Sequence, residues 1–122
     1  MPQRIQLSRA KGWRMPQGAV KVDRSTGYGN PFRVADCREA GYLGTDEQIA
    51  RRCVEAFDLW LGPHWYENWQ GTESEAARKR ILNGLHQIRG KDLACWCKLD
   101  QPCHADVLLR LANGPAQQAK EE

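Results

Sequence analysis

Two segments near the amino terminus alternate apolar with polar residues. Residues 4–9 and 19–23 both show this period of two, which is typical of half-buried β-strands. Residues 93–97 are instead short and continuously apolar, which favours a buried, parallel strand. The pattern therefore predicts a small sheet in which the first two strands pair.

Three further segments carry apolar residues at helical spacing. The first follows a capping box at residues 45–48, and the second follows a similar box at residues 72–75 and stops at Gly90. The third begins at Pro102, which suits the first turn of a helix, and ends at the Asn-Gly-Pro sequence of residues 113–115.

The resulting order is strand, strand, helix, helix, strand, helix, without an internal repeat. It predicts a small single-domain α/β protein with a sheet of about three to four strands and three helices, Rossmann-like in part. The domain covers residues 1–113, and the polar residues 114–122 form a disordered tail. Ligands in such sheets bind outside the carboxyl ends of the strands, so we expect function in the loops that follow them.

Size and composition indicate one soluble domain. The chain has 122 residues, and no stretch approaches the ~20 apolar residues that cross a bilayer. The amino terminus lacks the apolar run of a secretory signal, so we expect a cytoplasmic protein without disulfides.

Charge is concentrated at the amino-terminal end. The net charge is +3, yet residues 1–34 contain seven basic residues and one acidic residue, a local charge of +6. Such asymmetry favours a surface that meets phosphates, in a nucleotide or a nucleic acid, although a solvated basic face accounts for it equally well.

The densest chemistry lies in residues 95–106, which contain three thiols, an imidazole and two carboxylates between the third strand and the third helix. One interpretation is a zinc site made by Cys95, Cys97, Cys103 and His104, which are ligands of the right types. Cys95 and Cys97 lie on the same face of the predicted strand, so both thiols could bind one ion. Cys103 and His104 are adjacent, however, and zinc ligands are usually separated by two to four residues, which argues against this interpretation.

The same residues also fit thiol chemistry. A cysteine at a helix start is activated by the helix dipole, so Cys103 is a candidate nucleophile. His104 is then a candidate general base, with Asp106 or Asp100 to orient it. In the structural interpretation, the cysteines simply pack in the core and His104 caps the helix.

A third interpretation is noncovalent binding of a phosphate group at the start of the third helix. Arg24, Arg14 or Lys11 would close over it from the basic loops. Gly29 and Asn30, in a tight Gly-Asn-Pro loop, and Cys97 complete the predicted ligand-binding set. Four loop aromatics are candidates for stacking on a base: Trp13, Tyr28, Trp65 and Trp69.

Three motifs together resemble a known family. They are Gly29-Asn-Pro-Phe32 with Arg24 ahead of it, residues 90–97 and residues 102–108. Over residues 4–113 the chain is similar to the bacterial and phage family catalogued as domain of unknown function 4326. The resemblance implies no established activity, and its setting is compatible with a nucleotide or nucleic-acid partner in the bacterial host cytosol.

Two hypotheses follow. The leading one is a cytosolic α/β protein that binds a phosphate-bearing ligand, a nucleotide or nucleotide-derived molecule, between residues 24–32 and residues 97–106, with catalysis by Cys103 left open. The alternative is a zinc-stabilised module that binds nucleic acid or protein. A chelator distinguishes the two, because metal-binding energy in a small site is folding energy.

Overall fold

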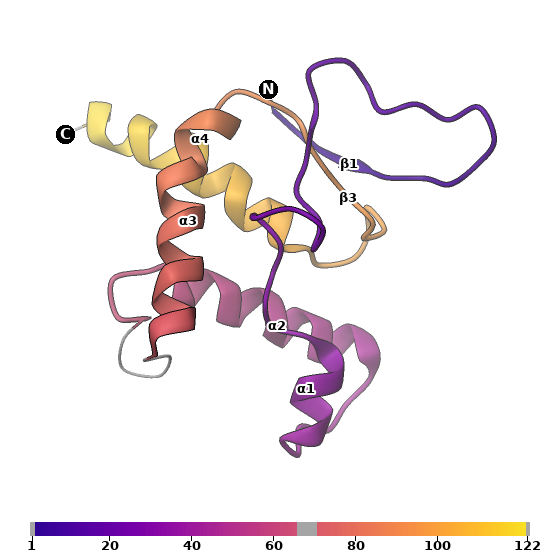
Figure 1. Cartoon of the computed structure of the whole chain (residues 1–122), viewed down its shortest axis with the longest axis vertical. Coiled ribbons are helices and arrows are strands. Elements are labelled where there is room, and N and C mark those ends of the chain that lie inside the picture. The colour runs from indigo at the N-terminus through magenta and orange to yellow at the C-terminus, as the bar shows by residue number, and fades with distance from the viewer. Residues whose placement is uncertain (1, 66–70, 122) are drawn as a thin grey trace.

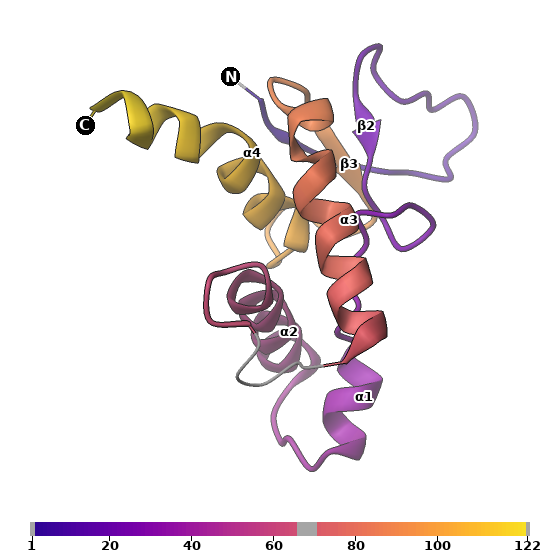
Figure 2. The same ribbon diagram turned by 60° about the vertical axis from the view of Figure 1, so that its left-hand side comes forward.

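The computed structural model describes residues 2–65 and 71–121. It is a small mixed α/β fold, as the sequence predicts, with a parallel sheet and helices around it (Figures 1 and 2). The elements in chain order are β1 (Arg4–Gln6), β2 (Val20–Lys21), α1 (Val34–Glu39), α2 (Asp46–Trp60), α3 (Thr72–Ile88), β3 (Leu93–Cys95) and α4 (His104–Glu121). No helix within the described residues is long and apolar enough to cross a membrane.

The sheet has the order β1-β3-β2, and both outer strands run parallel to β3. Ile5 of β1 pairs with Ala94, and Val20 of β2 pairs with Leu93. The two amino-terminal strands lie in one sheet, but the prediction that they pair with each other is wrong. β3 separates them because all three of its residues are buried, and a strand that is apolar on both faces suits the centre of a parallel sheet.

The two capping boxes have different outcomes. At the start of α2, Thr45 Oγ1 accepts a hydrogen bond from Gln48 N, and Gln48 Oε1 accepts one from Thr45 N. This box is complete, as predicted. The box predicted for α3 is wrong, because Thr72 is already helical and the N-cap is Gly71, which has no side chain to accept a bond.

Two helices differ from the prediction. No apolar period predicts α1, and none of its six residues is buried, so its packing against α2 supports it. α4 begins at His104 instead of Pro102 and continues beyond residues 113–115, so the predicted stop is wrong. The Ala, Gln, Lys and Glu residues after Pro115 are good helix formers, which favours continuation past one proline.

The core lies between the sheet and the three longer helices. Its largest fully buried side chains include Phe57, Trp60, Ile81, Leu93 and Leu108. α4 packs against β1 and β3 and also contacts α2 and α3, so its first turn is fixed at the carboxyl edge of the sheet. The loop between β1 and β2 extends away from the helices in both views (Figures 1 and 2).

Candidate metal centre

Four candidate ligands meet at the carboxyl edge of the sheet. Cys95 is the last residue of β3, and Cys97 follows two residues later. Cys103 lies directly before α4, and His104 is the first residue of that helix. We call these four residues the Cys–His centre. They meet because β3 ends at the same edge of the sheet at which α4 begins.

The donor atoms of Cys95, Cys103 and His104 lie close enough together to share a metal ion, and Cys97 lies beside Cys95. The Sγ atoms of Cys95 and Cys97 are 3.9 Å apart, and Cys103 Sγ is 3.7 Å from His104 Nδ1. The donor atoms of Cys95, Cys103 and His104 all lie within 4.8 Å of one another. Tetrahedral zinc bonds place two sulfurs about 3.8 Å apart, and a sulfur and a nitrogen about 3.5 Å apart. The cluster can therefore hold a metal ion with little rearrangement.

His104 presents Nδ1 to the centre because its other ring nitrogen is engaged. Nε2 lies 2.6 Å from the carbonyl oxygen of Val22, and since a carbonyl only accepts, Nε2 donates the proton and Nδ1 keeps its lone pair. Histidines that bind metals are commonly oriented in this way. The structure brings Cys103 and His104 together although they are adjacent in the chain. Adjacent Cys103 and His104 face one another because the first lies outside the helix and the second offers its nearer ring nitrogen.

Hydrogen bonds among the thiols give them unequal acidity. Bonds from Cys103 and Cys97, in that order, lower the pKa of Cys95 to about 2. Donation to Cys95 and Cys97, together with burial, raises the pKa of Cys103. A bond with Cys103 acts to lower the pKa of Cys97, but its bond to Cys95 and burial raise it overall. Burial lowers the pKa of His104, which keeps its imidazole neutral. The centre thus combines a thiolate with a neutral imidazole, and a bound cation would displace the remaining thiol protons.

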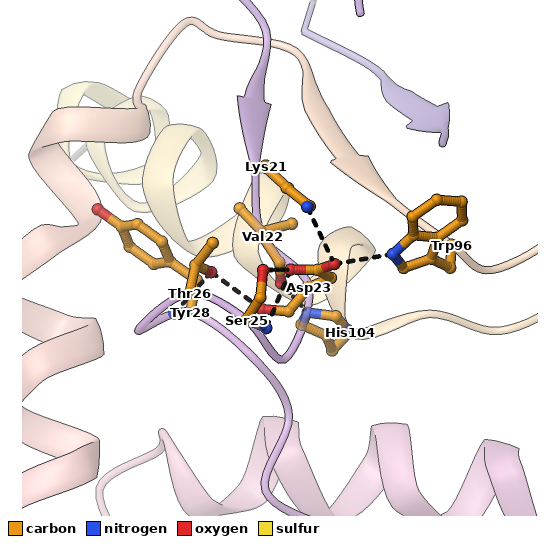
Figure 3. Close-up of polar contacts among 8 residues, drawn as sticks. All are labelled: Lys21, Val22, Asp23, Ser25, Thr26, Tyr28, Trp96 and His104. Atoms are coloured by element: carbon orange, nitrogen blue, oxygen red, sulfur yellow. Dashed lines mark hydrogen bonds and ion pairs between the residues drawn. The ribbon is translucent and has the colours of Figure 1, made fainter. Parts of the chain in front are cut away.

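A buried carboxylate fixes the chain beside the centre (Figure 3). Asp23 Oδ1 accepts from the backbone N of Ser25 at 3.0 Å and from its hydroxyl at 2.5 Å, and Oδ2 accepts from Trp96 Nε1 at 2.8 Å. Lys21 adds an ion pair at 3.7 Å. Burial acts to raise the pKa of Asp23, but these hydrogen bonds and the charge of Lys21 lower it overall. The carboxylate therefore ties the end of β2 to Trp96, which separates the first two cysteines.

Residues 23–32, which we call the 23–32 loop, are closed by two side chains. Arg24 Nε donates to the carbonyl of Asn30, and its Nη2 donates to the carbonyl of Phe32, both at 3.1 Å. Asn30, only 5% exposed, donates to a carbonyl of α2 and accepts from Phe32 N. Gly29 is required because a Cβ there would lie 2.6 Å from Arg24 Cα. The Gly-Asn-Pro motif therefore anchors the loop on α2.

A cavity lies on each side of the 23–32 loop. The first, of about 300 Å³, lies between the loop and the Cys–His centre, and we call it the turn cavity. The second, of about 320 Å³, lies between the loop and α3, and we call it the arginine cavity. Among the residues that the structure describes, its lining contains no carboxylate and three arginines: Arg24, Arg33 and Arg80.

Comparison with known proteins identifies the family of this chain. The sequence model of the family described as Domain of unknown function (DUF4326) matches residues 5–114. The chain belongs to the DUF4326 family. No curated protein and no solved structure matches this DUF4326 domain.

Most residues of the predicted ligand-binding set line one of the two cavities of the DUF4326 domain. Arg24, Gly29 and Asn30 line the arginine cavity, and Cys97 lines the turn cavity. Arg14 is exposed in the loop between β1 and β2 and lines neither of these cavities.

The structure does not bring Asp106 to His104. Asp106 is exposed, and its Oδ2 forms an ion pair with Arg4 Nη1 at 3.2 Å. Arg4 Nη2 also donates to the carbonyls of Lys98 and Leu99 at 3.1 and 2.6 Å. The Asp106 contact therefore belongs to a clamp that holds the turn of the Cys–His centre against β1.

The loop aromatics have different surroundings. Tyr28 donates from its hydroxyl to a carbonyl of α3 at 2.9 Å, and Trp65 lies 4.7 Å below the guanidinium of Arg78. Trp13 is half-buried in the loop between β1 and β2, and Trp69 lies outside the described residues.

Sequence reasoning misses four residues of this region. Asp23 is the last residue of the predicted strand 19–23, where a lone carboxylate beside apolar residues is a signal, and its partner Trp96 stands between two candidate ligands. Arg33 and Arg80 join the same cavity from distant parts of the chain, and no spacing in the sequence indicates that they meet.

Proposed function

We propose that the Cys–His centre binds a zinc ion and that this DUF4326 domain is a zinc-stabilised binding module. The observation that carries the proposal is the convergence of Cys95, Cys103 and the oriented imidazole of His104 within 4.8 Å, with Cys97 Sγ 3.9 Å from Cys95 Sγ as the candidate fourth ligand. Zinc suits this donor set because thiolate and imidazole are its usual ligands in structural sites. Such ligands persist in a reducing compartment, so the proposal keeps the bacterial cytosol as the setting.

The donor set favours a structural ion over a catalytic one. Under this proposal Cys97, whose Sγ lies 3.9 Å from Cys95 Sγ, completes a set of four protein ligands, and Cys95, Cys103 and His104 are buried, as is usual in structural zinc sites. Under this proposal the lone pairs of Cys103 and His104 are occupied by the metal. Cys103 then acts as a ligand instead of a nucleophile, and His104 acts as a ligand instead of a general base.

The ligand that we propose for the module is a phosphate-bearing molecule, a nucleotide or nucleotide-derived compound, with nucleic acid as the alternative partner. Support comes from the charge of +6 over residues 1–34 and from the cavity that Arg24, Gly29 and Asn30 help to line. Salt dependence separates the two partners. Binding of an oligonucleotide weakens steeply with salt because many counterions are released, whereas one small nucleotide shows a shallow slope.

Metal content and unfolding test the zinc proposal. Protein purified without chelator should contain one zinc ion per chain by elemental analysis and native mass spectrometry. A chelator should lower its melting temperature, because a ligand present at a thousand times its dissociation constant contributes about 4 kcal/mol. The proposal would be refuted if the purified wild-type protein contained no metal and if neither a chelator nor added zinc changed its melting temperature.

Two variants make the test specific. Cys103→Ser should lose zinc, whereas Cys37→Ser, which removes a half-buried thiol outside the centre, should keep it. Cobalt(II) gives an independent readout on wild-type protein, since its thiolate charge-transfer absorption reports sulfur ligands whether or not a variant folds. A cobalt complex without that absorption would show that the thiols do not bind the metal.

A further inference from the structure

Three arginines from separate elements line the arginine cavity. Arg24 belongs to the 23–32 loop, Arg33 is the N-cap residue of α1, and Arg80 lies within α3. Among the described residues, the side chains of Arg33 and Arg80 have no hydrogen-bond or ion-pair partner, and no carboxylate lines the cavity. Like charges repel, so three arginines without a counter-charge are less stable than the same three around an anion.

Arg24 is held in place before any ligand arrives, and Arg80 packs against the 23–32 loop. Arg24 uses Nε and Nη2 to close the 23–32 loop, which leaves Nη1 without a partner in the described part of the chain. Arg80 crosses the loop at Gly27, where a Cβ would lie 3.0 Å from Arg80 Cδ. Glycine at this position therefore allows the arginine to approach the loop. A guanidinium fixed in this manner offers a planar pair of donors that matches a phosphate group.

The remaining lining suits an organic group attached to that anion. Pro31, Trp60, Ala77 and Ile81 supply an apolar wall beside the charged groups. The volume of about 320 Å³ is at the small end of small-molecule sites. A small ligand with one charged end and one apolar body fits better here than a long polymer.

The turn cavity is a poorer place for a phosphate. Its lining includes the Asp23 carboxylate. This negative group repels an anion, whereas the arginine cavity attracts it.

We propose that the arginine cavity binds the phosphate group of a small phosphate monoester, such as a nucleoside monophosphate, through Arg24, Arg33 and Arg80. The inference rests on the proposed ligand class and assigns its charge to a particular site. The three arginines lie outside the Cys–His centre, so zinc content and phosphate binding are measured separately and the two proposals can fail separately.

Isothermal titration calorimetry with zinc-replete protein tests the inference. The probes are inorganic phosphate, adenosine 5′-monophosphate, adenosine, and a short single-stranded oligonucleotide without a terminal phosphate. Wild-type protein should bind the monophosphate more tightly than inorganic phosphate and should not bind adenosine measurably. Arg80→Gln and Arg33→Gln should each weaken the monophosphate roughly tenfold to a hundredfold, the usual effect of losing one charged hydrogen bond.

Arg51→Gln is the matched control. Arg51 is exposed on α2 and lines neither cavity, so this change removes the same charge and should leave binding unaltered. Circular dichroism and zinc content of each variant confirm that the fold persists. We avoid Arg24 as the test residue because it also closes the 23–32 loop.

Each other outcome has a definite meaning. Monophosphate binding that is unchanged in both Arg33→Gln and Arg80→Gln overturns the assignment of the site but keeps the proposed ligand class. Wild-type protein that binds neither phosphate nor nucleotide overturns both. Arginine-dependent binding of the oligonucleotide alone overturns the small monoester in favour of a nucleic-acid partner.

Discussion

Replacing Asp23 by asparagine tests the network that holds the 23–32 loop beside the Cys–His centre. The carboxylate accepts bonds from two Ser25 donors on one oxygen and from Trp96 Nε1 on the other, and it is only 8% exposed. In Asp23→Asn the new amide group must face one of these donors, so at least one bond is lost. A bond to a charged group contributes about 1.5–3 kcal/mol, and the remaining bonds weaken when the charge is removed. We expect a loss of about 3 kcal/mol, or roughly 10 °C in melting temperature.

Urea unfolding followed by tryptophan fluorescence measures this loss. A double-mutant cycle with Trp96→Phe isolates the Asp23–Trp96 bond, and we expect a coupling of about 1–2 kcal/mol. Asp100→Asn is the control, since Asp100 is exposed in the turn and its replacement should change stability by less than about 0.5 kcal/mol. Additive effects in the cycle, or an Asp23→Asn variant as stable as wild type, would refute the reasoning.

Three further predictions concern the same region. Because the folded pKa of Asp23 lies below its ordinary value of 3.8, its carboxylate stabilises the fold above that value, and this stabilisation should disappear as the pH falls through the folded pKa. When the free energy of unfolding is measured at decreasing pH, Asp23→Asn should therefore lose less stability than wild type. Arg4→Met should weaken zinc binding roughly tenfold to a hundredfold, as loss of supporting contacts around metal ligands usually does, and competition with a chromogenic chelator measures it. Gly29→Ala should lower stability by at least about 2 kcal/mol, because its Cβ would clash with Arg24. Gly114→Ala is the control: its Cβ meets only ordinary contacts within a helix, so it should raise stability by up to about 1 kcal/mol. Equal changes in the melting temperatures of the two variants would contradict this reasoning.

Local signals in the sequence predict the elements better than the way in which they pair. The capping box at Thr45 depends on residues three apart, and it forms as predicted. The sheet order depends on which strand is buried on both faces, and the continuous apolar run at Leu93 contains that information. Adjacency in the chain favours pairing of the first two strands, but burial places β3 between them.

The candidate site can also be predicted only in part from local sequence. The four candidate ligands of the Cys–His centre lie within ten residues, so the local composition alone draws attention to them. Their geometry depends on the Val22 carbonyl, which is distant in sequence and fixes the ring of His104. The arginine cavity depends wholly on tertiary structure, because α3 brings Arg80 to Gly27 across a long separation.

Three consecutive residues, 22–24, connect the two proposed sites. The Val22 carbonyl orients His104, Asp23 binds Trp96 beside the cysteines, and Arg24 lines both cavities. A short segment held by hydrogen bonds at each of these positions has little freedom to move at one end alone. A metal ion that fixes the Cys–His centre therefore also fixes the backbone from which Arg24 extends. This is a physical reason for a small domain to place a structural ion beside an anion site, because an arginine that is already held in position loses less conformational entropy when the ligand binds.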